Sequence, residues 1–215
     1  MAATLTTLRD RVEAALMDST NAVWDTGTLD EGIRQALHEY SREWPNEKVG
    51  TVNVASTGRE VDISGLTGLI GIGRVWLDYD ASNPADPPDW GRDFELWPGS
   101  LLYVGSGETE PQSGEVLRIF YTALHTLNGL DSETTTSVPL DHESLLVMGA
   151  CGYAAFSRAV DLAETAGVSA VSTPNLAALG SRWLRYFREQ LYNLREQNPS
   201  TGAVGPVRGG AWGRV

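Results

Sequence analysis

The chain has 215 residues and a mass of 23.2 kDa, which is enough for one domain or two small ones with a buried core. Hydrophobic residues make up 41% and charged residues 20%, a globular composition that excludes wholesale disorder. With 16 Lys and Arg against 28 Asp and Glu, the net charge is −12, so the chain lacks the overall basic field that binds duplex DNA. The single cysteine, Cys151, excludes an intrachain disulfide and a cysteine-based zinc site.

Two amphipathic helices are predicted at the N-terminus, within residues 1–46. In the first, apolar residues recur at spacings of three and four: Leu5, Leu8, Val12, Ala15 and Leu16. The second begins at a capping-box pair, Thr28 and Glu31, and ends before Pro45. Its apolar stripe comprises Leu29, Ile33, Leu37, Tyr40 and Trp44. Two such helices on either side of a short polar turn make a helical hairpin.

From Lys48 the hydrophobic pattern changes from helical to alternating. Short β-branched and aromatic runs, separated by Gly, Pro, Asp and Ser clusters, are typical of an antiparallel β unit. Residues 78–90 contain Pro84, Pro87 and Pro88 and are predicted to form a long exposed loop. We assign residues 47–137 to an inserted β domain. This domain carries most of the negative charge, since residues 47–140 hold 14 acids and 5 bases.

Two further helices are predicted in residues 138–198. Residues 145–156 are apolar nearly all round, as expected for a helix enclosed by others, and the uncharged stretch 144–157 is too short to span a bilayer. Thr173 and Pro174 begin the last helix, which ends before Pro199. The sequence therefore predicts an α+β fold: a four-helix bundle of two N-terminal and two C-terminal helices, an inserted antiparallel β unit, and a flexible C-terminal arm at 199–215. We expect no signal peptide and no membrane attachment, because the N-terminus lacks a long apolar core.

Residues that often carry catalysis do not form a recognisable constellation here. Asp141, His142 and Glu143 are adjacent, so on a helix they point in different directions and do not share one metal ion. His38 and His125 have no nucleophile motif nearby, and Cys151 lies in the apolar helix. The glycines between 65 and 73 lack the Gly-Lys-Ser/Thr of a P-loop. We therefore predict no catalytic residue, no metal site and no cofactor.

Acidic and aromatic side chains gather near the long loop. The acids are Asp78, Asp80, Asp86, Asp89, Asp93 and Glu95. A glycosidase needs two carboxylates at a fixed separation, which a Pro-rich loop does not promise, so we interpret these acids as solvated loop charge. Trp76, Trp90 and Trp97 suit stacking on a sugar or base, and they equally suit anchoring a protein interface. We prefer the interface, because Trp dominates protein–protein hot spots.

The charge changes sign near the C-terminus. Residues 181–215 hold six arginines against two glutamates. The arm bears Arg208, Trp212 and Arg214 among glycines and a proline, a composition that suits ordering on a partner surface. A frayed terminus is the alternative for the same composition.

Three stretches carry a family resemblance. They are Leu29-x-x-x-Ile33-x-x-Ala36-Leu37-x-x-Tyr40-Ser41-x-x-x-Pro45, residues 114–125 and residues 138–150. In pattern and order, over most of residues 1–198, the chain resembles the head-to-tail connector (adaptor) proteins of tailed double-stranded DNA bacteriophages.

The resemblance implies a structural virion protein that is not an enzyme. Such adaptors form a ring, commonly of twelve copies, below the portal protein in the neck between capsid and tail, after assembly in the host cytoplasm. The ring extends the channel through which double-stranded DNA passes without specific binding, and it docks stopper or tail proteins. In similar proteins the C-terminal segment reaches the portal. Two alternatives stay open: a cell-wall polysaccharide hydrolase that uses the acidic and aromatic loop residues, and a monomeric binding module.

Overall fold

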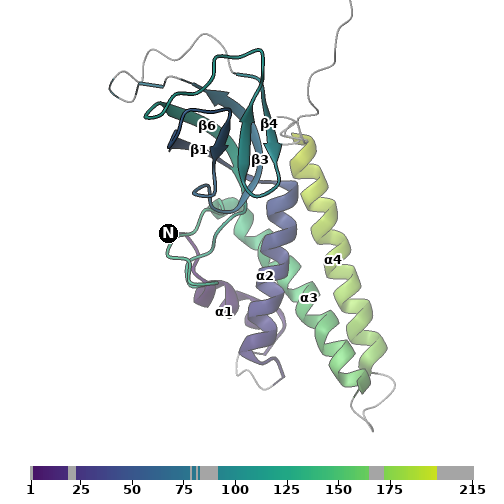
Figure 1. Ribbon diagram of the computed structural model, residues 1–215. Coiled ribbons are helices and arrows are strands. Elements are labelled where there is room, and N and C mark those ends of the chain that lie inside the picture. Colours follow the sequence, from purple (N-terminus) through teal and green to yellow (C-terminus); the bar gives the residue numbers. More distant parts are fainter. Residues whose placement is uncertain are drawn as a thin grey trace, which may run out of the picture. The chain divides into compact units, whose positions relative to one another are not determined.

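The computed structural model describes residues 2–18, 23–77, 79–80, 82, 92–164 and 172–197. These residues form a mixed α+β fold with four α-helices and two small antiparallel sheets (Figure 1), which confirms the prediction of an α+β fold with an antiparallel β unit. The chain divides into two compact units. The helical unit comprises Met1–Trp44 and His125–Pro199, and the β unit includes Pro45–Leu124.

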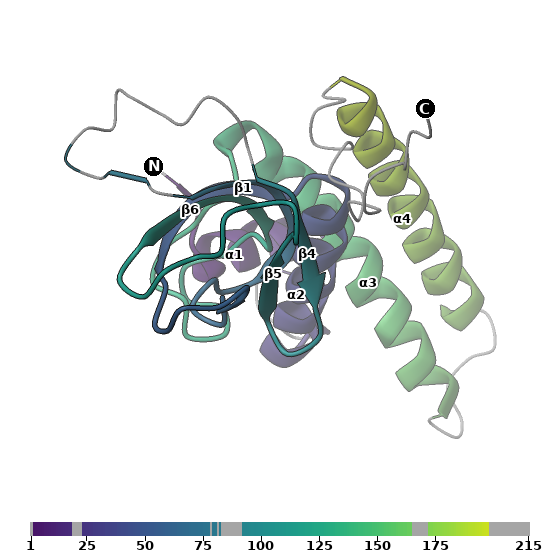
Figure 2. The same cartoon turned by 45° about the horizontal axis from the view of Figure 1, so that its top comes forward.

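The helical unit contains all four helices. They are α1 (Leu5–Ala15), α2 (Thr26–Glu43), α3 (Glu143–Glu164) and α4 (Ser172–Gln197), and a short 3-10 helix, Leu140–His142, leads into α3. Figures 1 and 2 both show α3 between α2 and α4, and α3 also contacts α1. The predicted apolar stripes face this shared core, in which Leu8, Val12, Leu29, Ile33 and Phe187 are almost fully buried.

Small residues on α3 let its neighbours approach closely. Cys151, Ala154 and Ala155 are completely buried. A Cβ atom at Gly32 of α2 would lie 2.9 Å from the carbonyl oxygen of Ala150, and a Cβ at Gly152 would lie 2.8 Å from Cγ of Leu184 on α4. These glycines therefore set the spacing between α3 and both of its larger neighbours.

The apolar helical segment is longer than the uncharged stretch of the sequence. Leu140–Ala163 is long and apolar enough to cross a membrane by length and composition alone, with a mean hydropathy of 1.3 in its most apolar window. The expectation for the uncharged stretch 144–157 does not extend to this whole helix, which continues past that stretch to Glu164. More than half of that window, 56%, is buried in the protein, as in a core helix.

Residues 125–137 belong to the helical unit, whereas the sequence analysis assigned them to the β domain. They have no helical period, but Leu127 and Leu130 pack into the helical core. The segment is also tied to the start of α1, where Leu5 N donates to the carbonyl oxygen of Asn128 at 2.8 Å. The β unit therefore ends where these leucines begin to pack into the helical core, before the next regular helix starts.

The N-terminal caps of α1 and α2 differ from the predicted pattern. Asp25 caps α2, accepting from Thr28 N at 2.9 Å, so the helix begins two residues before the predicted Thr28–Glu31 box. A capping box does occur, but at α1, between Thr4 and Thr7. Asp25 is the stronger cap because its carboxylate also accepts from the Thr28 hydroxyl, at 2.6 Å.

The β unit consists of two three-stranded sheets. The first has the order β1 (Asn46–Asn53), β6 (Val116–Ala123), β3 (Leu69–Trp76), and the second has the order β2 (Glu60–Asp62), β5 (Leu101–Val104), β4 (Phe94–Trp97). All four strand pairings are antiparallel. Side chains from both sheets share one core, which includes Val61, Ile63, Val75, Leu102, Leu117 and Ile119.

Removal of the β unit should leave the helical unit folded. The two ends of the helical unit lie close together where the β unit departs, since His125 Nε2 is 3.0 Å from the carbonyl oxygen of Trp44. We expect a chain with residues 46–123 replaced by a short Gly/Ser linker to remain helical by circular dichroism and to melt cooperatively. The matched control replaces residues 46–137, which also removes Leu127 and Leu130, and should melt at a lower temperature. Loss of helicity in the first variant would contradict an independent helical unit.

Candidate functional site

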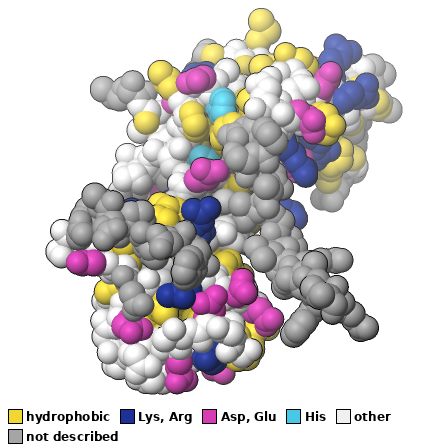
Figure 3. All heavy atoms as spheres, turned by 90° about the horizontal axis from the view of Figure 1, so that it is seen from above, with side chains coloured by type: hydrophobic (Ala, Val, Ile, Leu, Met, Phe, Trp, Pro, Cys, Tyr) yellow, Lys and Arg dark blue, Asp and Glu magenta, His cyan; other side chains and the backbone are white. Residues whose placement is uncertain are grey.

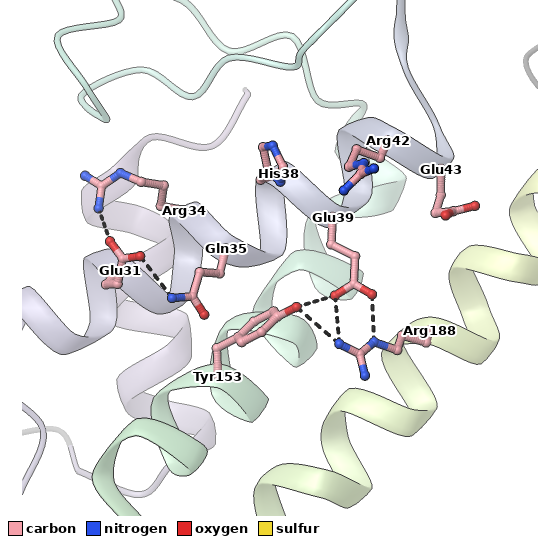
Figure 4. Close-up of a pocket in the computed structure, with 9 residues that line it drawn as sticks. All are labelled: Glu31, Arg34, Gln35, His38, Glu39, Arg42, Glu43, Tyr153 and Arg188. Atoms are coloured by element: carbon pink, nitrogen blue, oxygen red, sulfur yellow. Dashed lines mark hydrogen bonds and ion pairs between the residues drawn. The ribbon is translucent and has the colours of Figure 1, made fainter. Parts of the chain in front are cut away.

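The helical unit contains an open polar cleft with a volume of about 890 Å³ (Figure 4). Seven of its lining residues come from the polar face of α2, opposite the buried apolar stripe, and one each comes from α3 and α4. They are Glu31, Arg34, Gln35, His38, Glu39, Arg42, Glu43, Tyr153 and Arg188. On α2 the spacing of three and four residues places these side chains on one face.

The Glu39 carboxylate links three helices at the centre of the cleft. Arg188 of α4 donates from Nε to Glu39 Oε1 at 2.7 Å, and the hydroxyl of Tyr153 on α3 donates to Glu39 Oε2 (Figure 4). Burial, and then the Glu39 carboxylate, raise the pKa of Tyr153, and the hydrogen bond to Glu39 raises the pKa of Arg188. Both donors therefore stay protonated at neutral pH and hold the carboxylate in place.

Further ion pairs flank this centre. Arg34 bridges Glu31 and Asp131, with Nη2 at 2.7 Å from Asp131 Oδ1, and Arg195 Nη1 lies 3.2 Å from Glu43 Oε2. The hydrogen bond from Arg34 lowers the pKa of Asp131. These side chains are partly exposed, so each pair contributes little to stability.

Two donors in the cleft are left without a partner among the described residues. No described side chain forms a hydrogen bond or ion pair with His38 or Arg42. Figure 4 shows both side chains pointing away from Glu39. The cleft therefore combines a fixed central network with two donors that are available to another molecule.

A second polar cluster, around His125 and His142, is built into the core. Tyr40 packs against both imidazole rings, and its hydroxyl lies 2.6 Å from His142 Nδ1. Burial lowers the pKa of His142, partly opposed by Asp141, so the neutral ring accepts from Tyr40. His125 Nε2 faces the carbonyl oxygen of Trp44, which only accepts, so this nitrogen is the donor. The two rings therefore have defined hydrogen-bonding roles in the fold, His142 as an acceptor at Nδ1 and His125 as a donor at Nε2.

The residues around His142 point in different directions. Asp141 is exposed, whereas Glu143 is buried and accepts from Ala3 N at 2.7 Å and from Arg11 Nη1 at 2.9 Å. Glu143 thereby ties the N-terminal segment to the start of α3, a role that the sequence did not reveal. Within the described part of the chain, no three His, Cys, Asp or Glu side chains are grouped to hold a metal ion. Cys151 is buried, which raises the pKa of its thiol to about 12.

The described tryptophans of the predicted interface have partners inside the β unit. Trp76 meets Phe120 edge to face, with ring centroids 4.6 Å apart, and the Arg118 guanidinium lies over Trp76 and Tyr79. Trp97 stacks on Tyr103 at 4.4 Å and donates from Nε1 to Glu95 Oε2. Of the remaining predicted interface and loop residues, these lie outside the described ranges: Trp90, Arg208, Trp212, Arg214, Asp78, Asp86 and Asp89. The role of Trp76 and Trp97 in an interface stays a prediction.

The helix pair α3–α4 leaves large apolar side chains in solvent. Five of them are between 38% and 61% exposed: Phe156, Val160, Leu179, Tyr186 and Tyr192. On α4, Arg182 and Arg185 lie between Leu179 and Tyr186, and they have no hydrogen-bond or ion-pair partner among the described residues. Figure 3 shows acidic and basic side chains interspersed on the face in view. The sequence analysis did not identify these exposed side chains.

Comparison with protein-family models gives no match, and no curated protein matches the chain either. What the chain does therefore has to be inferred from its own residues.

The lowered pKa of His142 predicts a pH-dependent stability. The unfolded chain takes up a proton at the ordinary value of 6.5, whereas the folded chain resists protonation until a lower pH. Stability is therefore unaffected by this group well above that value and falls as the pH drops below it. We expect the melting temperature of His142→Gln to fall less than that of the unmodified chain between about pH 7.5 and about pH 5.5. His38→Gln, at an exposed position, serves as control and should keep the original pH dependence. An unchanged slope in His142→Gln would contradict this role.

Proposed function

We propose that this chain is a structural subunit in the neck of a tailed bacteriophage, a head-to-tail adaptor that forms a ring below the portal protein. The ring extends the DNA channel and docks stopper or tail proteins. In this proposal the four helices act as a four-helix bundle that forms the ring wall, and the β unit is an insertion in it. The subunit is not an enzyme and needs no cofactor.

The observation that carries the proposal is the exposed apolar surface of α3 and α4. Scattered exposed apolar side chains are ordinary, but five large ones along one helix pair are typical of a surface that another protein covers. Tyr186 and Tyr192 share α4 with Arg182 and Arg185, and Tyr and Arg are enriched at interface hot spots. This composition supports assembly through α3 and α4, with neighbouring adaptor subunits as the partners.

The pairing of the arginines supports a channel that does not grip DNA. Seven described arginines form ion pairs with carboxylates: Arg9, Arg11, Arg34, Arg92, Arg158, Arg188 and Arg195. An arginine that is held by a carboxylate is not available to neutralise a phosphate, and the net charge of the chain is −12. Double-stranded DNA would therefore pass such a wall without specific binding.

Imaging of the assembled protein tests the proposal. We expect negative-stain microscopy and native mass spectrometry to detect a closed ring, of about twelve copies by family resemblance, when the chain is mixed with the purified portal protein of its particle. A chain that stays monomeric with portal, and that cleaves bacterial cell-wall glycan, would overturn the proposal in favour of the hydrolase. A monomer without such activity would favour the binding module.

Deletion of the arm tests its part in portal binding. We propose that residues 200–215 dock on the portal or on a neighbouring subunit, with Trp212 as the apolar anchor and Arg208 and Arg214 as charged donors. The chain without residues 200–215 should bind portal at least tenfold more weakly, by roughly the loss of one hot spot. Trp212→Ser keeps the length of the arm and should account for most of the loss. Undiminished binding by both variants would identify the arm as a frayed end.

A further inference from the structure

The α2 residues that line the polar cleft form two rows, in each of which a residue recurs every four positions. The first, the acidic row, comprises Glu31, Gln35, Glu39 and Glu43. The second, the donor row, comprises Arg34, His38 and Arg42. Residues four positions apart lie on one face of a helix and are separated by about 6 Å along its axis. Helix α2 therefore presents carboxylates and donors to the cleft in two neighbouring rows.

Every carboxylate of the acidic row already has a partner within the chain. Glu31 accepts from Gln35 Nε2 at 3.0 Å and also pairs with Arg34. Glu39 and Glu43 are held by arginines of α4, at 2.7 Å and 3.2 Å. The acidic row is therefore satisfied, and it does not need a ligand.

The donor row is occupied only at its first position. The Asp131 carboxylate accepts from Arg34 Nε at 3.0 Å and from Arg34 Nη2 at 2.7 Å, which is a two-point contact. His38 and Arg42, one and two turns farther along α2, are exposed and have no partner among the described residues. In Figure 4 Glu39 points toward α4, whereas these two side chains point away from it. Three successive turns thus offer donors on one face, and a carboxylate occupies one of them.

The surroundings of the donor row favour a carboxylate over a phosphate. Asp131 on Arg34 shows that a carboxylate fits a guanidinium of this row. The neighbouring acidic row repels any anion, and a phosphate monoester, with about two negative charges, is repelled more than a carboxylate with one. Duplex DNA brings a phosphate charge about every 1.7 Å and is repelled more strongly still by a chain of net charge −12.

The spacing of the free donors fits an extended peptide. Along a β-strand, side chains at alternate positions share one face and are about 6.8 Å apart. This is close to the separation of about 6 Å along the axis between His38 and Arg42. The cleft volume of about 890 Å³ is also in the upper part of the range for ligand sites, about 300–1,000 Å³. A peptide with acidic residues at alternate positions can therefore place one carboxylate on each free donor.

We propose that the donor row binds an acidic segment of another protein, with one carboxylate on His38 and the next on Arg42. Arg34 keeps Asp131 as its partner, so it marks one end of the site. The partner is defined by its chemistry, which is an extended segment with Asp or Glu at alternate positions. This inference goes beyond the proposed adaptor function and does not depend on ring formation.

Fluorescence anisotropy with a labelled Ser-Glu-Ser-Glu-Ser-Glu peptide tests the site on the full chain at low salt. We expect Arg42→Gln to weaken binding at least fivefold and His38→Ala about threefold, because each removes one charge-assisted or neutral hydrogen bond. Arg182→Gln is the matched control, since Arg182 is also exposed and without a partner among the described residues but lies outside the cleft. It should leave binding unchanged. The peptide with Gln in place of Glu should not bind.

Arg42→Lys separates binding from helix stability. Arg42 lies in the last turn of α2, where a positive charge favours the helix, and lysine keeps that charge. Lysine lacks the planar fork of the guanidinium, so Arg42→Lys should melt like the unmodified chain and still bind the peptide more weakly.

Four results would overturn the proposal. The first is that the unmodified chain does not bind the Ser-Glu peptide. The second is equal weakening by Arg42→Gln and Arg182→Gln, which would indicate general charge attraction. The third is stronger competition by inorganic phosphate or a short DNA duplex than by unlabelled peptide, which would indicate a phosphate site. The fourth is self-association that Arg42→Gln abolishes and excess peptide does not, which would identify a second copy as the occupant.

Discussion

Close packing around α3 is the constraint on which the helical unit depends. The glycines and alanines of its first half allow α2 and α4 to approach so closely that Gly32 and Gly152 have no room for a side chain. That half of α3 is consequently enclosed, and α2 and α4 come near enough for Glu39 and Arg188 to form an ion pair across the cleft. Farther along α3, Phe156 and Val160 remain about half exposed.

A buried polar cluster connects the two halves of the helical unit at the point where 80 residues, Pro45–Leu124, are inserted between them. The backbone N–H of His125 donates to Ser41 Oγ at 3.0 Å, and its imidazole reaches the carbonyl oxygen of Trp44 and the Ser137 hydroxyl. Each of these buried groups is satisfied, so the cluster stabilises the fold rather than straining it. It fixes the two points where the chain leaves and re-enters the helical unit, independently of the β unit.

The helices and the antiparallel strands were predictable, because their apolar periods of 3.6 and 2 are local properties of the sequence. The cleft was not. Glu39 meets Tyr153 and Arg188 across 114 and 149 residues, and nothing in the sequence around any of them indicates the other two. The end of the β domain was misplaced for a related reason, since Leu127 and Leu130 are buried without a helical or strand period.

In the proposed ring, the pairing of arginines with carboxylates determines which arginines can bind another molecule. A neck subunit must hold its neighbours and yet let DNA pass. Releasing a paired arginine such as Arg188 to a phosphate would leave the partly buried Glu39 carboxylate without its counter-charge, which opposes the release. The arginines that have no carboxylate among the described residues of the helical unit are Arg42, in the cleft, and Arg182 and Arg185, on the exposed side of α4. Their free donors lie where a protein partner with carboxylates would gain charge-assisted hydrogen bonds on docking. In the proposed ring, the arginines that are already paired with carboxylates would not bind DNA, and the unpaired arginines would bind carboxylates of a neighbouring subunit.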